Sequence, residues 1–418
     1  MNQATRVQRT YLTLVLLTTL SASLIWGINT LFLLDAGLNN LEAFTANAFF
    51  TAGMVLFEVP TGVVADLRGR RVSFLLGAVT LTASTLLYVL MWQINAPFWG
   101  WAVVSVLLGL GFTFFSGAME AWLVDALTHS GYTGELDAVF GRGQAVSGAA
   151  MLAGSILGGV LAQATNLGVP FLARAVLLAL TFGLAFFLMH DIGFTPTRGK
   201  RPGPEVRRLF DDSLHHGLGQ PAVRWVMLTS PFVGGVGIYA FYAMQPYLLE
   251  LYGDEEAYGI AGLAAAIVAG AQIVGGLLAP RLRSAFRRRT SMMLAMTAAS
   301  TLALLLVGAV QHFAAVIALL VAWSLASAAE TPVRQAYLNA LIPSQQRATV
   351  LSFDSLLSSS GGVVLQPGLG RVADVWGYPV TFALSAGFQA CALPFLWLAR
   401  RLGVPEDVVT RDRPVAET

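Results

Sequence analysis

Four carboxylates and one arginine lie inside stretches of the sequence that are otherwise apolar. They are Glu58, Glu120, Glu330, Arg334 and Asp354. An ionised side chain inside a membrane-spanning helix costs about 2.5–3.5 kcal/mol, so each residue needs a partner or a function. Burial favours the neutral form of a carboxyl group, and changing access to water lets such a group take up and release a proton. These residues predict proton exchange rather than covalent catalysis.

The neighbours of each carboxylate help to separate a proton carrier from a static ion pair. Glu330 precedes Arg334 by four residues, so both share one helix face and are expected to pair as a gate latch. Glu120 has no cation four residues away, which leaves a proton carrier and a static contact equally open. Glu58, just before Pro60, and Asp354, two turns into its helix, are further candidates for proton coupling.

A short polar stretch, PTGVVADLRGRR at residues 60–71, separates two long apolar runs. Its polar and turn-forming residues are Gly62, Asp66, Gly69, Arg70 and Arg71. Glycine permits the backbone to turn where a side chain would clash. Arginines alone would suit a loop on the cytoplasmic side of a membrane. Asp66 carries the opposite charge, so topology does not explain the whole stretch.

The composition is that of a membrane protein. Of the 418 residues, 56% are hydrophobic and only 11% are charged, whereas soluble proteins carry about a quarter charged residues. A net charge of +2 without a basic stripe argues against a nucleic-acid partner. Cys391 is the only cysteine, and the five histidines lack metal-ligand spacing, so we expect no disulfide, no metal and no cofactor.

The apolar runs predict twelve membrane-spanning helices, since a bilayer core needs about 20 helical residues per crossing. The first run continues through Leu34, which is too long for a cleaved signal peptide. The predicted spans are 11–34, 43–65, 72–92, 98–127, 141–164, 169–190, 222–250, 257–281, 290–310, 313–341, 348–372 and 378–399.

The loops divide and orient these helices. We expect an N-terminal six-helix bundle (1–192), a cytoplasmic linker loop (193–221), a C-terminal six-helix bundle (222–401) and a cytoplasmic tail (402–418). With the N-terminus inside, all Lys and Arg except three face the cytoplasm; the exceptions are Arg174 and Arg371, near the outer face, and Arg334, within a helix. This asymmetry predicts a protein of the cytoplasmic (inner) membrane with both termini in the cytoplasm.

The two halves of the chain resemble each other. GVLA at 159–162 and GVP at 168–170 reappear as GRVA at 370–373 and GYP at 377–379. Glu120 and Glu330 take matching positions in the fourth helix of each half. Two halves that start on the same side predict a two-fold axis along the membrane normal, with a cavity between the halves.

EVPTGVVADLRGRR at residues 58–71 resembles the loop between helices two and three of the major facilitator superfamily, whose pattern is G-x-x-x-D-x-x-G-R-[RK]. The resemblance covers essentially the whole chain and implies an all-α membrane fold of two pseudo-symmetric six-helix bundles. It also implies that Arg70 forms a charge relay with Asp125. We further expect Asp66 to accept hydrogen bonds from a helix N-terminus near residues 347–351 when the cytoplasmic side is closed.

Two further stretches resemble signatures of the family but differ from them. GSILGG at 154–159 matches the antiporter pattern G-P-x-x-G-G at Gly154, Gly158 and Gly159, with Ser155 in place of proline. Tight helix packing by small residues explains this stretch equally well. In SVLLGLG, Ser105 takes the place of the arginine in R-x-x-Q-G-x-G, which puts the usual arginine-based proton coupling in doubt.

Aromatic and amide residues mark a candidate substrate cavity. In this family helices one and seven face the centre; here Trp26 and Asn29 form one stripe, and Tyr239, Tyr242 and Gln245 form another. Phe112 and Phe115 are weaker candidates. Such walls suit an amphipathic organic solute, although ordinary helix packing produces the same spacing.

The sequence therefore predicts a secondary active transporter that moves a small organic solute by alternating access. We expect proton-coupled efflux by a monomer in the lipid bilayer, nearest to the bacterial drug/proton antiporters. The alternative within this class is proton-coupled uptake of a nutrient or metabolite. The alternatives from other classes are a non-transporting receptor with the same fold and a polytopic membrane enzyme, for which no catalytic constellation is found.

Overall fold

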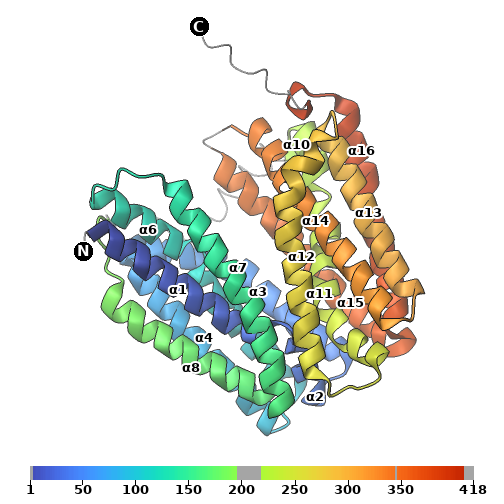
Figure 1. Cartoon of the computed structure of the whole chain (residues 1–418), viewed down its shortest axis with the longest axis horizontal. Helices are drawn as coiled ribbons and strands as arrows, with labels where there is room; N and C mark the ends of the chain where they lie inside the picture. Colours follow the sequence, from blue (N-terminus) through green and yellow to red (C-terminus); the bar gives the residue numbers. More distant parts are fainter. Residues whose placement is uncertain (1–2, 195–217, 344–345, 409–418) are drawn as a thin grey trace. The chain divides into compact units, whose positions relative to one another are not determined.

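The computed structural model describes residues 3–194, 218–343 and 346–408 (Figure 1). Over these residues the chain is helical, and β pairing is limited to one isolated bridge between Arg288 and Val408. The helices are α1 Gln3–Trp26, α2 Asn29–Asp35, α3 Asn40–Arg68, α4 Arg70–Gln93, α5 Phe98–Phe115, α6 Ala118–His129, α7 Leu136–Ala164, α8 Gly168–Leu188, α10 Pro221–Met227, α11 Ser230–Tyr252, α12 Tyr258–Ser284, α13 Arg289–Ala309, α14 Phe313–Leu341, α15 Arg347–Ala390, α16 Ala392–Leu402 and the 3-10 helix Pro405–Asp407.

Eleven described segments are long and apolar enough to cross a membrane. The last, Val350–Leu402, has 53 residues, about 80 Å of helix against a hydrocarbon core of about 30 Å. Its backbone leaves the helical conformation at Gly377, with φ 78° and ψ 171°. The all-α membrane fold is confirmed. Two crossings joined at Gly377 would give the predicted twelve, a number that stays a prediction.

The chain forms two compact units. Unit 1 comprises Met1–Arg207, Ile238–Gly270 and Gly362–Tyr378, and unit 2 comprises Arg208–Gly237, Ala271–Gly361 and Pro379–Thr418. Helices α11 and α12 therefore contribute one part to each unit, and α15 contributes its middle to unit 1 and both of its ends to unit 2. The predicted linker at 193–221 lies largely outside the described residues. The predicted division into two six-helix bundles stays a prediction.

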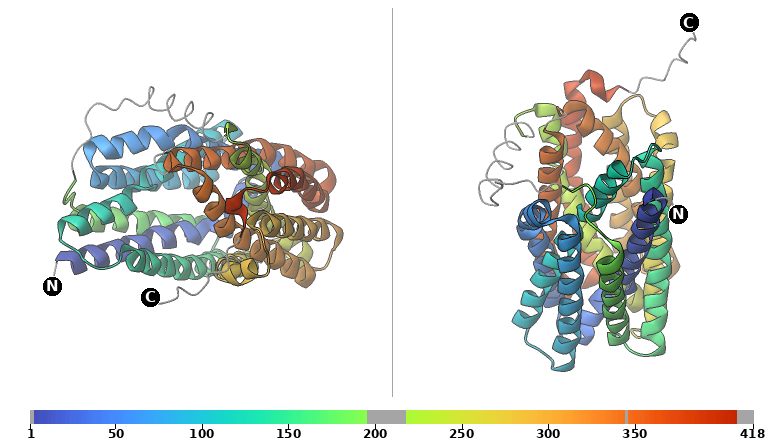
Figure 2. Two further views of the ribbon diagram at one scale, coloured as in Figure 1. Left: turned by 90° about the horizontal axis from the view of Figure 1, so that it is seen from above. Right: turned by 90° about the vertical axis from the view of Figure 1, so that its left-hand side faces the viewer.

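Unit 1 is built around long helices that run alongside one another (Figures 1 and 2). Its aromatic core centres on Phe32, which packs against Tyr88, Trp101 and Phe171, the last at a ring-centroid distance of 4.0 Å. We call the end of unit 1 where α2 stops and α3 begins the Asp35 face. The opposite end, where α3 stops and α4 begins, is the Gly69 face.

Two helices of unit 1 are interrupted. The first break, at Gly27 and Ile28 between α1 and α2, lies against α12: a Cβ on Gly27 would come within 3.0 Å of Gly262 Cα. The second break separates α5 from α6 at Ser116 and Gly117, where Gly117 has φ 68°. A broken helix exposes backbone groups and polar side chains inside the bundle, so both breaks concentrate polar contacts.

Unit 2 has its own core, formed where α10, α13, α14 and α16 pack together around Tyr337, Met292 and Leu396. The end of the described chain is attached to this core. Asp407 is fully buried and accepts hydrogen bonds from the backbone N–H and the hydroxyl of Thr290, at 2.8 and 2.7 Å. This carboxylate therefore provides an acceptor for a backbone N–H group in the first turn of α13.

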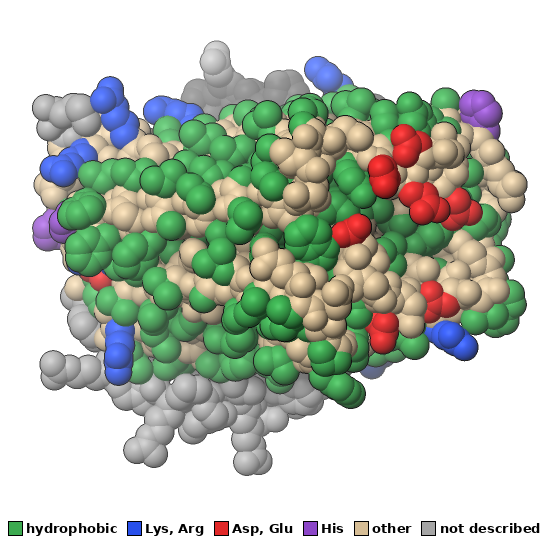
Figure 3. All heavy atoms as spheres, turned by 90° about the horizontal axis from the view of Figure 1, so that it is seen from below, with side chains coloured by type: hydrophobic (Ala, Val, Ile, Leu, Met, Phe, Trp, Pro, Cys, Tyr) green, Lys and Arg blue, Asp and Glu red, His purple; other side chains and the backbone are tan. Residues whose placement is uncertain are grey.

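Hydrophobic side chains cover much of the molecular surface, as Figure 3 shows for one face. Large apolar residues such as Trp99, Phe187 and Leu277 are exposed by 70%, 71% and 72%. Acidic side chains gather in one region of the face in Figure 3. Apolar surface on this scale fits contact with lipid.

Candidate functional site

The predicted gating stretch forms the turn between α3 and α4. Gly69 has φ 105°, a conformation that disfavours any residue with a Cβ. Asp66 and Arg70 form an ion pair of 2.8 Å one helical turn apart. Arg70 thus pairs with Asp66 rather than with Asp125, the partner that the resemblance implies, because α3 and α4 hold Asp66 and Arg70 across the same turn. Asp125 is half-buried on α6.

Asp191 completes this turn and was not predicted. Its carboxylate accepts a hydrogen bond of 2.9 Å from the backbone N–H of Arg71, so it caps the first turn of α4. A Cβ on Gly69 would collide with this carboxylate. Burial raises the pKa of Asp191, while the hydrogen bond from Arg71 and the charges of Arg71 and Arg70 oppose the rise.

The carboxylates of unit 1 are less buried than the sequence suggests. Glu58 is exposed and accepts a hydrogen bond of 2.9 Å from Ser116 Oγ, at the break between α5 and α6. Glu120 is also exposed, since it lies in the first turn of α6 directly after this break. An acidic residue in the first turn complements the helix dipole. The burial assumed for a proton carrier is not found at Glu120.

Unit 2 contains a network of three ionisable side chains, two of them buried and Arg334 half-buried (the Arg334 network: Glu330, Arg334 and Asp354). Arg334 binds both oxygens of Asp354, at 2.5 and 2.6 Å, and Ser230 Oγ at 2.5 Å. Ser230 in turn donates to Asp354 at 2.6 Å. Glu330 and Asp354 are only 4% and 8% exposed.

The partner of Arg334 corrects the prediction. The spacing of four residues indicates an ion pair with Glu330, but the bidentate pair is with Asp354 of α15. Glu330 instead accepts a hydrogen bond of 2.9 Å from Thr297 Oγ1 of α13. Two planar groups on adjacent helices can align both pairs of atoms, whereas sharing a helix face only brings side chains near each other.

The predicted cavity stripes divide into packing residues and accessible residues. Gln245, 1% exposed, donates to Trp26 O at 2.7 Å and accepts from Thr30 N at 2.9 Å. It thereby provides hydrogen-bond partners for backbone groups on both sides of the break between α1 and α2. Gln245 is therefore a packing residue rather than part of a cavity wall. Tyr239 is also fully buried, with its ring 4.8 Å from that of Phe44.

Three of the five cavity candidates stay accessible: Trp26, Asn29 and Tyr242 are half-buried. Asn29 donates a hydrogen bond of 3.0 Å to Asn47. Phe112 and Phe115 are half-buried as well. These residues stay our candidates for the substrate cavity.

The glycine stretch of α7 is a packing surface in unit 1. A Cβ on Gly158 would collide with Leu24 O of α1, and one on Gly159 would lie 2.8 Å from Gly262 Cα of α12. A Cβ on Gly154 would likewise collide with the Ser23 hydroxyl of α1. Such close approaches are typical of small-residue helix interfaces in membranes, whatever the direction of transport.

Arg174 is the one arginine that is buried among the described residues. The sequence placed it near a membrane face, but it lies in the second turn of α8 and is 3% exposed. Its guanidinium carbon is 5.6 Å from the centre of the Phe112 ring. The sequence puts Arg174 inside the predicted span 169–190 but does not show that it is buried.

Asp374 holds α15 against α3 at the Asp35 face and was also missed. Its two carboxylate oxygens accept from the backbone N–H groups of Asn40 and Leu41, at 2.9 and 3.0 Å. Tyr378 donates to Asn40 Oδ1 at 2.5 Å. A signal was present: VADVWG at 372–377 repeats VADLRG at 64–69, and both stretches end in a glycine with positive φ.

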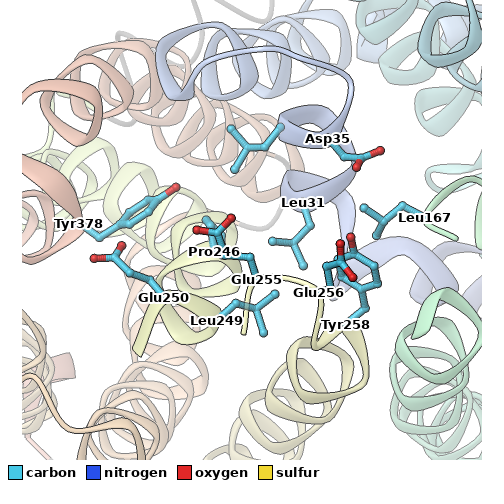
Figure 4. A pocket seen from close by; sticks show the side chains of 11 residues that line it. Leu31, Asp35, Leu167, Pro246, Leu249, Glu250, Glu255, Glu256, Tyr258 and Tyr378 are labelled. Atoms are coloured by element: carbon cyan, nitrogen blue, oxygen red, sulfur yellow. The ribbon is translucent and has the colours of Figure 1, made fainter. Parts of the chain in front are cut away.

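A cavity of about 430 Å³ opens beside this contact (Figure 4). Four carboxylates, Asp35, Glu250, Glu255 and Glu256, line it together with Tyr258 and Tyr378. Asp35 accepts a hydrogen bond of 2.7 Å from Trp92. Within the described ranges no three His, Cys, Asp or Glu side chains are placed to hold a metal ion.

Comparison with known proteins identifies the family of this chain and solved structures with a similar fold. The model of the family described as Major Facilitator Superfamily matches residues 11–303 and 257–417. No curated protein matches the sequence. Solved structures with a similar fold include the nucleoside transporter NupG, with 11% identity and a TM-score of 0.74 over 95% of this chain and 99% of that one.

Two further structures are similar over nearly the full length. A bacterial homologue of the human lysosomal transporter Spinster, in an inward-facing and unoccupied conformation, has 15% identity and a TM-score of 0.70, covering 98% of this chain and 99% of that one. The D-xylose-proton symporter has 15% identity and a TM-score of 0.69, covering 97% and 98%. At these identities the similarity shows the fold alone.

Proposed function

Because the chain belongs to the major facilitator superfamily, we propose that it is a secondary active transporter that couples the movement of a small organic solute to protons. The proposed topology has both termini in the cytoplasm, which makes the Gly69 face cytoplasmic and the Asp35 face external. The protein acts in the cytoplasmic membrane as a monomer.

The observation that carries proton coupling is the Arg334 network. Two buried carboxylates and one half-buried guanidinium lie together inside candidate membrane-spanning helices, so the network has a formal charge of −1 when both acids are ionised. Binding one proton makes it neutral and removes most of the cost of burying the excess charge. Glu330 is the proton carrier in this proposal, because Asp354 already holds Arg334 through two hydrogen bonds.

The alternating gates are formed by the two V-A-D-x-x-G stretches. Asp374 caps the first turn of α3 in unit 1, which closes the Asp35 face. Asp66 has the matching place at the end of α3, and we propose that it caps the first turn of α15, residues 347–351, when the opposite side closes. The two contacts would then exchange during the transport cycle and bias a two-state equilibrium.

We propose export of an amphipathic solute in exchange for protons. The support is the resemblance of Gly154, Gly158 and Gly159 to the antiporter signature. A proton gradient that drives solute in the same direction as protons would instead establish uptake by symport. Specific binding without flux in either direction would establish a non-transporting receptor.

The test uses purified protein in proteoliposomes. Solutes that raise its thermal midpoint are identified first, and their flux is then measured with and without a pH gradient. We expect Glu330→Gln to lose accumulation driven by the gradient while it retains solute exchange. Glu120→Gln is the matched control and should keep both. Full response of Glu330→Gln to the pH gradient would remove the Arg334 network from proton coupling.

A further inference from the structure

Arg174 is a buried charge that the chain itself leaves without an acidic partner. It is 3% exposed, and its Nε is buried without a hydrogen-bond acceptor. It makes no hydrogen bond and no ion pair with the residues that the structure describes. A buried cation without a counter-charge destabilises the folded protein. Either another interaction stabilises the charge of Arg174, or the charge is kept for a use other than stability.

The surroundings of Arg174 are aromatic. The Phe112 ring lies under the guanidinium at 5.6 Å, and the electrostatic neighbours are Tyr242 of α11 and Tyr88 of α4. Tyr88 is bound to Ser105 through a short contact of 2.5 Å, which occupies its hydroxyl. All of these residues lie in unit 1, and none of them is a carboxylate.

Two of the aromatic residues near Arg174 are only partly buried. Phe112 and Tyr242 are both half-buried, and both come from residues that the sequence predicts for the substrate cavity. A solute that enters beside these two rings would reach the unoccupied N–H groups of Arg174. Arginine presents these donors in a planar fork, which matches the two oxygens of a carboxylate or phosphate.

We propose that Arg174 binds the oxyanion of the transported solute, a carboxylate or a phosphate, while Phe112 and Tyr242 pack against its apolar or aromatic part. This inference rests on the proposed function, since it names the substrate class of the same cavity. The solute is therefore an amphipathic organic anion. In a site shielded from water, one such charge pair provides both affinity and discrimination against neutral analogues.

The main rival is a structural arginine, held by its contact with Phe112. The two roles make opposite predictions for the protein without solute. If Arg174 is an anion-binding residue, Arg174→Met removes an unpaired buried charge and leaves the thermal midpoint equal to or above that of the wild type. If Arg174 supports the fold, the midpoint falls. Arg371→Met, which removes an exposed arginine of the same unit, controls for the loss of one positive charge.

The second readout is binding of matched probes to the purified full-length protein. Benzoate, phenylacetate and phenyl phosphate are compared with benzamide, phenylacetamide and benzyl alcohol. We expect only the anions to raise the thermal midpoint of the wild type, and at least about tenfold more anion to be needed in Arg174→Met. Arg174→Lys should recover part of the response, because it keeps the charge but not the fork.

Two results would overturn the proposal. One is a lower midpoint of Arg174→Met without solute, which assigns Arg174 to the fold. The other is an equal response of the wild type to anions and neutral analogues across all six probes. The anion site and the proposed transport can fail separately. Selective anion binding without flux would contradict only the proposed transport. Proton-driven flux of a neutral solute would contradict only the anion site.

Discussion

Two arginines inside the described helices, Arg334 and Arg174, have their charges accommodated in different ways. Arg334 in unit 2 is bound by both oxygens of Asp354 and by Ser230, so its charge is balanced within the chain. Arg174 in unit 1 is more deeply buried, and its nearest described contact is the Phe112 ring. Both sit in helices that cross the membrane, where an unpaired charge is expensive.

The difference separates coupling from recognition. A guanidinium that has its own carboxylate can only redistribute protons within the network, because a ligand would have to displace a strong internal pair. A guanidinium without one keeps its hydrogen-bond donors for an incoming anion. We therefore propose that proton coupling belongs to unit 2 and solute recognition to unit 1.

The largest effect is expected when the internal pair of Arg334 is broken. Asp354→Leu removes the bidentate partner of Arg334, leaving Glu330 as the remaining acid of the network, and should destabilise the protein by about 3–5 kcal/mol. Unfolding in detergent by denaturant measures this loss. The double variant Arg334→Met, Asp354→Leu removes the stranded charge, so it should recover most of the stability. A double variant as unstable as the single one would mean that packing, not charge, explains the loss.

A smaller effect is expected when Arg174 is given a carboxylate. Phe112→Glu places an acid where the aromatic ring now lies, 5.6 Å from the guanidinium carbon. Relative to Phe112→Gln, its uncharged control, we expect a gain of about 1.5–3 kcal/mol in stability and loss of the response to benzoate. If Phe112→Glu is the less stable variant, Arg174 does not lack a partner, and the contrast between the two arginines fails.

The smallest effect concerns Asp191, a partly buried carboxylate stabilised by a backbone N–H and nearby arginine charges. Its pKa lies above the ordinary value of 3.8 because burial outweighs these favourable contacts. A raised pKa means that its contribution to stability is complete below the ordinary pKa and is lost as the pH rises through the raised one. The stability of the wild type relative to Asp191→Asn should therefore decrease as the pH rises above about 4.

Thermal midpoints of the two proteins across this pH range measure the trend. A difference that instead increases with pH would show that the contacts with Arg71 and Arg70 outweigh burial. Asp191 would then resemble Asp354, whose charge is fully satisfied.

Much of the fold follows from local pattern. Apolar runs of about 20 residues predict membrane helices because no other element satisfies the backbone in lipid except a closed barrel. Gly69 predicts the turn between α3 and α4, since its φ of 105° suits only glycine. The interruption at Gly377 lies between the predicted spans 348–372 and 378–399. The break at Gly117 was not predicted, because an isolated glycine in an apolar run is also compatible with a continuous helix.

The candidate site was less predictable, because its contacts join distant segments. The helical spacing places Tyr239, Tyr242 and Gln245 on one face of α11. It does not show that the Gln245 amide is already hydrogen-bonded to Trp26 of α1 and Thr30 of α2. Similarly, sequence spacing links Arg334 to Glu330, whereas the bound carboxylate is Asp354, from the next helix.

The sequence by itself determined that this is a helical membrane protein with charges that must be explained, because the cost of placing a charged residue in lipid depends on residue type alone. Only the tertiary structure decided which charges are compensated. Asp354 neutralises Arg334 and nothing in the described chain neutralises Arg174, since pairing depends on distances of a few ångströms between helices that are far apart in sequence.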